Sequence, residues 1–236
     1  MPVAGEPLIR QRDIVFYDTP DFRLYENHFI LRRRTQYQDG WTRMHDELTF
    51  KFRHPEEAVV AGIDVHPGLS LQARVKFKRE ILPEPDRVGG IRYIYAKNCL
   101  LEMPPLTEQF LAETALGFFP VLETIGVDHS TLLGLVNSVT VSESLTEFGT
   151  LAFGHGLEAM VGLALWRHSE SGTPIVGELG FQLKFDALTP AVEAGIARAE
   201  EFFKLAQHCI APWMFLGTTK TNLVYRHGGH AVSNRG

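Results

Sequence analysis

The sequence predicts an α+β protein built mainly on antiparallel β-strands. Several segments alternate apolar and polar side chains, which is the pattern of a strand with one buried face and one wet face. Two other segments repeat apolar residues at helical spacing, so we expect helices to flank the sheet. With 236 residues and 44% hydrophobic composition, the chain is long enough to bury one full core. We expect a single domain over residues 1–226 and a flexible C-terminal tail over residues 227–236.

The N-terminal half contains two turn sequences that separate predicted β-strands. The turn sequence Asp18–Asp21 contains Pro20, which fixes φ at the bend. A second turn signal, Gln38 to Gly40, predicts that the segments on either side of it pair as a hairpin. The predicted strands of this half are residues 8–17, 28–36, 46–53 and 71–82.

The C-terminal half is predicted to repeat this order of strands and helices. A helix is expected to begin at Thr107 and to run to about Leu116. A longer one is expected from Thr189, as N-cap, to about Cys209, because Pro190 suits the first helical position. The predicted strands of this half are residues 136–143, 157–168, 175–185 and 218–226.

Composition narrows the possible functions. The net charge of −5 argues against a general nucleic-acid surface. The two cysteines, Cys99 and Cys209, lie in unrelated contexts and suggest neither a disulfide framework nor a metal site, so a reducing compartment is expected. Neither a secretory signal nor a membrane-spanning apolar run is found. We therefore expect a cytoplasmic protein without membrane contact.

The polar faces of the predicted strands are unusually basic. Within residues 28–34, Arg32 and Arg34 share one face, and within residues 46–53 Lys51 lies opposite the apolar Phe50. Cationic side chains from several strands that point to one place would repel each other if no anion lay between them. Arginine and lysine both bind phosphate well, so a phosphate group is a suitable anion. The alternative is that these residues lie on ordinary strand faces that are exposed to solvent and bind no anion. The candidate phosphate-binding residues are Arg32, Arg34, Lys51, Arg74, Lys76 and Lys220.

These motifs resemble those of a known family. Tyr17–Pro20, then Leu31–Arg34, then Leu48–Lys51 resemble the CYTH family of triphosphate tunnel proteins, which includes thiamine-triphosphatase, inorganic triphosphatases and class IV adenylate cyclases. The resemblance implies a closed antiparallel barrel whose basic faces line a water-filled tunnel. It also implies that Arg32, Arg34 and Lys51 bind phosphate, and that Arg74, Lys76 and Lys220 match later basic positions of the family.

The acidic residues depart from the family pattern. Family enzymes open with an ExExK strand whose glutamates hold a divalent metal, and residues 1–10 do not supply it. The late strand keeps Glu178 but has Gly180 where the family commonly has a second glutamate. The resemblance implies that Glu178 is the catalytic and metal-binding residue, with Mg²⁺ or Mn²⁺ as the cofactor and Glu47 or Glu80 as helpers. The alternative is that Glu178 is only a structural partner of one tunnel arginine.

Two functions follow from this pattern. The first is a metal-dependent triphosphatase acting on inorganic tripolyphosphate or an organic triphosphate. The second is a binding module that holds a polyphosphate or nucleotide without hydrolysing it, because the metal-binding glutamates have been lost. A cyclase ranks third, since no residue is identified that would recognise adenine. The particular triphosphate, and whether the chain forms a homodimer, stay open.

Overall fold

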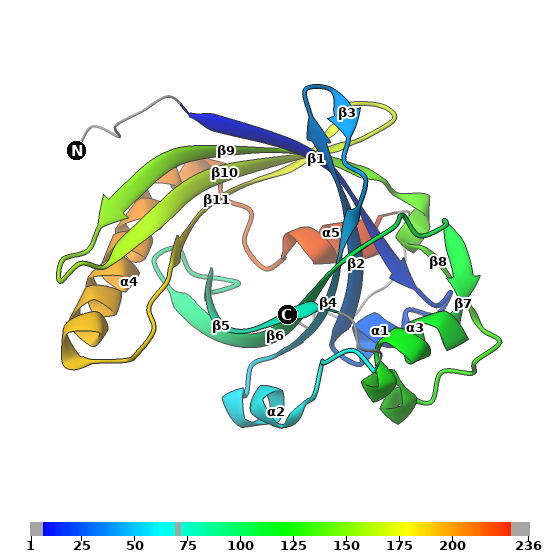
Figure 1. Cartoon of the computed structure of the whole chain (residues 1–236). Helices are drawn as coiled ribbons and strands as arrows, with labels where there is room; N and C mark the ends of the chain where they lie inside the picture. The colour runs from blue at the N-terminus through cyan, green and yellow to red at the C-terminus, as the bar shows by residue number, and fades with distance from the viewer. Residues whose placement is uncertain (1–6, 69–71, 228–236) are drawn as a thin grey trace.

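The structure is a computed structural model that describes residues 7–68 and 72–227. Its centre is a curled antiparallel sheet with the strand order β11-β10-β9-β1-β2-β4-β6-β5 (Figure 1). This confirms the predicted fold class. The long strands are β1 (Leu8–Asp18), β2 (Phe29–Gln38), β4 (Asp46–His54), β5 (Ala73–Pro83), β6 (Ile91–Met103), β9 (Val141–Ala152), β10 (Glu158–His168) and β11 (Pro174–Leu183). The short strands are β3 (Trp41–Thr42), β7 (Gln109–Leu111) and β8 (Leu132–Leu135).

Helices pack on both sides of this sheet (Figure 1). The α-helices are α1 (Arg23–Glu26), α2 (Glu57–Gly62), α3 (Ala112–Phe118), α4 (Pro190–Ile210) and α5 (Lys220–Tyr225), and the 3₁₀ helices are η1 (Pro120–Ile125), η2 (Val136–Ser138) and η3 (Ala211–Trp213). In the described residues, no helix is both long and apolar enough to cross a membrane.

The main apolar core lies on the outer face of the curl. Phe50 of β4 is fully buried there and stacks on Phe29 at 5.3 Å and on Phe119 at 4.2 Å between ring centroids. Residues of α3 and η1, such as Leu116 and Leu122, complete this cluster. Burying a side chain such as Phe50 contributes about 1.5–3 kcal/mol. The alternation seen in the sequence therefore becomes an apolar outer face and an inner face that carries the charged residues. The inner face is itself apolar where a second cluster, including Phe16 and Trp166, packs against Tyr225 of α5.

The predicted barrel is not closed by hydrogen bonds in the described residues. Within the described ranges, no hydrogen-bonded pairing joins β11 to β5, which are the two ends of the strand order. Helix α4 contacts both ends instead. At the β11 end, Phe203 of α4 contacts Phe181 of β11 edge to face, with 6.1 Å between ring centroids. Further along α4, Gln207 accepts a hydrogen bond from the Gly89 nitrogen at 3.0 Å, and its amide nitrogen donates to the Gly90 carbonyl at 3.1 Å.

Several elements differ from the prediction. Strand β6 was not predicted, because Ile94 and Ala96 on its inner face are buried like Cys99 on its outer face, so the alternation is masked. The helix expected from Thr107 is instead β7 followed by α3. The last predicted strand is helix α5, which Thr219 caps by accepting a hydrogen bond from the Asn222 nitrogen at 3.3 Å.

Other boundaries agree more closely. Thr189 caps α4, since its Oγ1 accepts a hydrogen bond from the Val192 nitrogen at 3.3 Å. The strand expected at 136–143 begins as η2, and β9 starts only at Val141. The turn at Asp39–Gly40 has positive φ at both residues, 51° and 83°, as a two-residue hairpin requires. Most of the predicted tail, residues 228–236, lies outside the described residues.

Candidate anion-binding site

The arginines and lysines predicted on the strands share the inner face of the sheet. Opposed residues of neighbouring strands project to the same side, and the register can therefore be followed across the sheet. A row of residues opposed in this register runs across the sheet from Arg32 in β2 to Arg74 in β5. The next row runs from Lys51 in β4 to Lys76 in β5. Arg34 lies two residues from Arg32 and has the same orientation.

Arg32 is the cation of this face that most clearly lacks a counter-charge. Its Nη2 donates to Thr49 Oγ1 at 3.4 Å, and its buried Nε has no hydrogen-bond partner among the described residues. In the same residues, no carboxylate lies within ion-pairing distance of it. Burial, and after it the neighbouring Arg34, hold the pKa of Arg32 well below its ordinary value. A guanidinium in this environment is stabilised by a bound anion.

Arg34, Lys51 and Arg53 are partly neutralised by inner-face glutamates. Arg34 donates to Glu47 at 2.9 Å, but its Nε is buried and unpaired in the part of the chain that is described. Lys51 lies 2.6 Å from one oxygen of Glu80, and Arg53 lies 3.1 Å from the other. Burial lowers the pKa of Lys51 to about 8, although Glu80 opposes this shift.

The cations of distant strands affect one another across the curl. Burial lowers the pKa of Lys78 in β5, and Lys76, Arg32 and Arg34 lower it further, whereas Glu80 raises it. Strand β2, which carries the two arginines, is separated from β5 by β4 and β6 in the sheet. Arg32 and Arg34 therefore act on Lys78 from a strand that is not its neighbour in the sheet.

The remaining predicted residues, Lys220 and Glu178, meet on the same face. Lys220 begins α5, and its Nζ lies 2.7 Å from Glu178 Oε1 and 3.9 Å from Glu143 Oε2. The Nζ also lies 4.9 Å from the ring centroid of Trp166. Glu178 thus pairs with a cation in this structure, and that cation is a lysine rather than an arginine.

The turn after β1 fixes the position of α5 and hence of Lys220. Asp18 accepts hydrogen bonds from the backbone nitrogens of Leu24 at 2.9 Å and Tyr25 at 3.0 Å. It also accepts one from the Tyr225 hydroxyl at 3.0 Å, and the Tyr225 ring stacks on Tyr25 at 4.0 Å. Burial raises the pKa of Asp18 to about 6, while these donors oppose the shift. The aspartate of the Tyr17–Pro20 motif therefore holds the helix that carries Lys220.

Arg74 lies at the rim of the face. Its side chain is 63% exposed, and the nearest carboxylate oxygen, on Glu102, is 4.0 Å away. Exposed pairs of this kind contribute about 0–1 kcal/mol. Lys76, also exposed, lies beside it on β5. These two residues are available to a ligand but are not strongly held.

Two inner-face residues were not singled out in the sequence. Glu143 of β9 is 1% exposed and forms an ion pair with Arg12 of β1. Its other oxygen accepts a hydrogen bond from Trp166 Nε1 at 2.5 Å. Arg10 and Arg12 stand two residues apart and so share one face of β1, which was a signal for Arg12, but only the pairing of β1 with β9 brings Glu143 to it.

The carboxylates of this face fit at most one divalent ion shared with a substrate. Over the described residues, no three His, Cys, Asp or Glu side chains are grouped to hold a metal. Glu143 has both oxygens engaged, by Arg12 and Trp166. Glu178 is 53% exposed and contacts only Lys220 among ion-pair partners in those residues. Mg²⁺ accepts one or two carboxylates if phosphates and waters complete its shell, so Glu178 suffices for a single shared ion.

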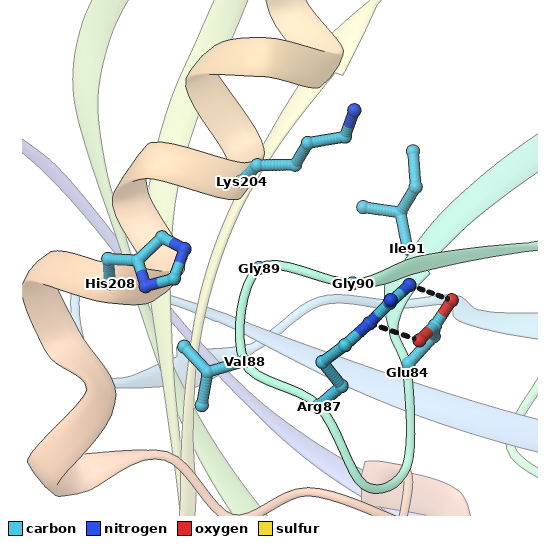
Figure 2. A pocket seen from close by; sticks show the side chains of 8 residues that line it. All are labelled: Glu84, Arg87, Val88, Gly89, Gly90, Ile91, Lys204 and His208. Carbon is cyan, nitrogen blue, oxygen red and sulfur yellow. Dashed lines mark hydrogen bonds and ion pairs between the residues drawn. The ribbon is translucent and has the colours of Figure 1, made fainter.

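A separate hollow of about 380 Å³ lies between the β5–β6 loop and α4 (Figure 2). Its Arg87 forms a two-point contact with Glu84, at 2.9 and 3.0 Å. Its Lys204 pairs with Glu201 at 2.6 Å. Because these cations are already neutralised, this hollow is a weaker candidate for an anion than the inner face.

Comparison with known proteins gives only distant likenesses. No family model matches the chain, and no curated protein matches it. A solved protein from Hippeastrum, a candidate adenylyl cyclase described with a dominant triphosphatase activity, has a TM-score of 0.44 and 14% identity, covering 96% of this chain and 86% of that one. A candidate adenylate cyclase from Bacillus halodurans has a TM-score of 0.36 and 11% identity, covering 93% and 83%. Both scores lie below 0.5, so neither likeness assigns a function to this chain.

Proposed function

We propose that this protein binds a condensed phosphate, either inorganic tripolyphosphate or the triphosphate of an organic compound, on the inner face of its sheet. The observation that carries the proposal is Arg32, a largely buried guanidinium with an unpaired Nε and no carboxylate partner among the described residues. Leaving such a group uncompensated is costly, and a phosphate oxygen is its natural partner.

The surrounding residues support a ligand with several negative charges. Arg34 offers a second planar fork, while Lys51 and Lys76 offer point charges from neighbouring strands. Acids on the same face, such as Glu80, hold these cations in place before the ligand arrives. The resemblance of Leu31–Arg34 and Leu48–Lys51 to the triphosphate tunnel family is an independent, sequence-based reason for the same ligand.

Thermal unfolding with tripolyphosphate tests this proposal. At a hundredfold excess over Kd, the ligand should add about 2.7 kcal/mol to the free energy of unfolding, or about 5–10 °C in Tm for a chain of this size. The shift should shrink in Arg34→Ala and Lys51→Ala, and inorganic phosphate at equal ionic strength should give little. An unchanged melting curve for the wild-type protein would contradict the proposal.

Hydrolysis of the bound triphosphate is a second candidate, which the exposed Glu178 favours. Here Glu178 would hold a Mg²⁺ or Mn²⁺ ion, which supplies positive charge against the phosphate and polarises it. Arg32 and Arg34 would hold the phosphate oxygens and stabilise the charge that develops on them. Lys220, now paired with Glu178, would turn to the phosphate when the ligand arrives.

Phosphate release from tripolyphosphate tests the second candidate. We expect release only with Mg²⁺ or Mn²⁺ present, and a loss of at least about a hundredfold in Glu178→Gln, as for removal of a group that stabilises the transition state. Glu102→Gln at the rim is the matched control and should retain activity. Absence of release by the wild-type protein with either metal would limit the function to binding.

A further inference from the structure

Asn98 is a buried polar residue on the inner face that the site described above does not use. It belongs to β6, where it pairs with Lys51 of β4 on one side and Lys76 of β5 on the other. The residue is 8% exposed, and its Oδ1 has no hydrogen-bond partner among the described residues. The register therefore places an unsatisfied carboxamide in the row of predicted phosphate-binding lysines.

An unpaired amide in this position costs stability. A buried polar group without a partner costs about 1–3 kcal/mol, whereas an apolar side chain of similar shape in its place can be neutral or stabilising. Ile94 and Ala96, which lie on the same inner face of β6, are apolar and buried. Packing alone would therefore be served better by leucine than by asparagine.

The carboxamide is chemically suited to the anion proposed for this face. A phosphate drawn between Lys51 and Lys76 would lie beside it, and the NH₂ end of an amide donates to phosphate oxygens. The O and NH₂ ends have nearly the same shape, so turning the amide over replaces Oδ1 by Nδ2 at the same place. A neutral donor also adds no repulsion to this face, where burial already lowers the pKa of Lys51 to about 8.

We infer that Asn98 is a ligand-contacting residue, which donates a hydrogen bond from Nδ2 to the phosphate bound between Lys51 and Lys76. This rests on the proposed function. It gives the site one uncharged donor among its cations, which can contact a phosphate oxygen whether or not that oxygen is paired with a lysine.

Asn98→Leu provides the test, because stability and affinity should move in opposite directions. The free variant should melt about 2–4 °C higher than the wild-type protein, since an unpaired amide has been removed. Its Kd for tripolyphosphate, measured by calorimetry, should be about tenfold weaker, since a hydrogen bond to a charged group has been lost. A Kd equal to that of the wild-type protein would overturn the inference.

Asn98→Asp separates a donor from an acceptor and keeps the side-chain volume. It carries no NH₂ group and adds a negative charge, so its Kd should be weaker than that of Asn98→Leu. A Kd as tight as in the wild-type protein would show that the side chain at this position does not contact the phosphate, and would overturn the inference. If the wild-type protein does not bind tripolyphosphate at all, the proposed function fails; if it binds and Asn98→Leu binds equally well, only the role of Asn98 fails.

Discussion

Replacing Arg32 by glutamine should remove most of the affinity for tripolyphosphate and should make the free protein more stable. The guanidinium donates only to Thr49 at 3.4 Å and leaves its Nε unpaired among the described residues, so the variant loses little in the free state. In the complex, the variant loses charge-assisted hydrogen bonds worth about 1.5–3 kcal/mol, so its Kd should be about 10- to 100-fold weaker. Calorimetric titration and thermal unfolding measure the two effects.

Arg74→Gln is the matched control for this prediction. Arg74 lies on the same face and in the same row as Arg32, but its side chain is 63% exposed at the rim. Its loss should change Kd by less than about fivefold, because exposed charges contribute at most about 1 kcal/mol. Equal losses in Arg32→Gln and Arg74→Gln would mean that the phosphate does not lie at the buried centre of the face.

Glu80→Gln should have the opposite pattern, a less stable protein that binds tripolyphosphate more tightly. Glu80 contacts Lys51 at 2.6 Å and Arg53 at 3.1 Å, and its removal leaves both cations without this partner. Breaking a buried pair costs about 3–5 kcal/mol, and we expect about 2–3 kcal/mol here because the Glu80 side chain is 25% exposed. The bound phosphate would take over the two cations, so saturating tripolyphosphate should restore most of the lost stability.

The pH dependence of stability checks the same contact. Burial alone would raise the pKa of Glu80, but Lys51 and Arg53 outweigh it and lower the pKa to about 2 from its ordinary 4.5. The folded state therefore favours the charged form, and the stabilisation is complete above about pH 4.5 and is lost as the pH falls towards 2. Urea titrations of the wild-type protein and Glu80→Gln should differ most above pH 5 and converge near pH 2. A difference that does not depend on pH would contradict this assignment.

The alternation of apolar and polar residues was sufficient to predict the strands that carry the cations and the face on which each cation lies. Alternation along residues 28–36 and 46–53 places Arg32, Arg34 and Lys51 opposite the apolar Phe50 and Phe52, and the structure keeps this division between the two faces. The prediction succeeds because a strand residue's face depends only on its position in the strand. It failed for β6, where both faces are buried and the alternation is lost.

The partners of the acidic residues in the site were harder to predict from the sequence. Glu178 is where it was expected, but its partner Lys220 was placed in a strand, whereas it begins α5. Helix α5 forms because Thr219 caps it and Tyr225 anchors it to Asp18, a residue 207 positions away. A six-residue helix of this kind depends on tertiary packing, which local propensity does not report.

The sequence by itself determined the fold class, the two-faced strands and the basic character of one face, because these follow from the alternation of side chains along each strand. The tertiary structure alone decided that α4 lies between the two unpaired ends of the sheet and which carboxylate neutralises which cation. It also decided that Arg32 and Asn98 lack full hydrogen-bond partners among the described residues. These depend on strand order, on α4 contacting both ends of the sheet and on α5 reaching the inner face, and all of them are set by contacts between residues far apart in the chain.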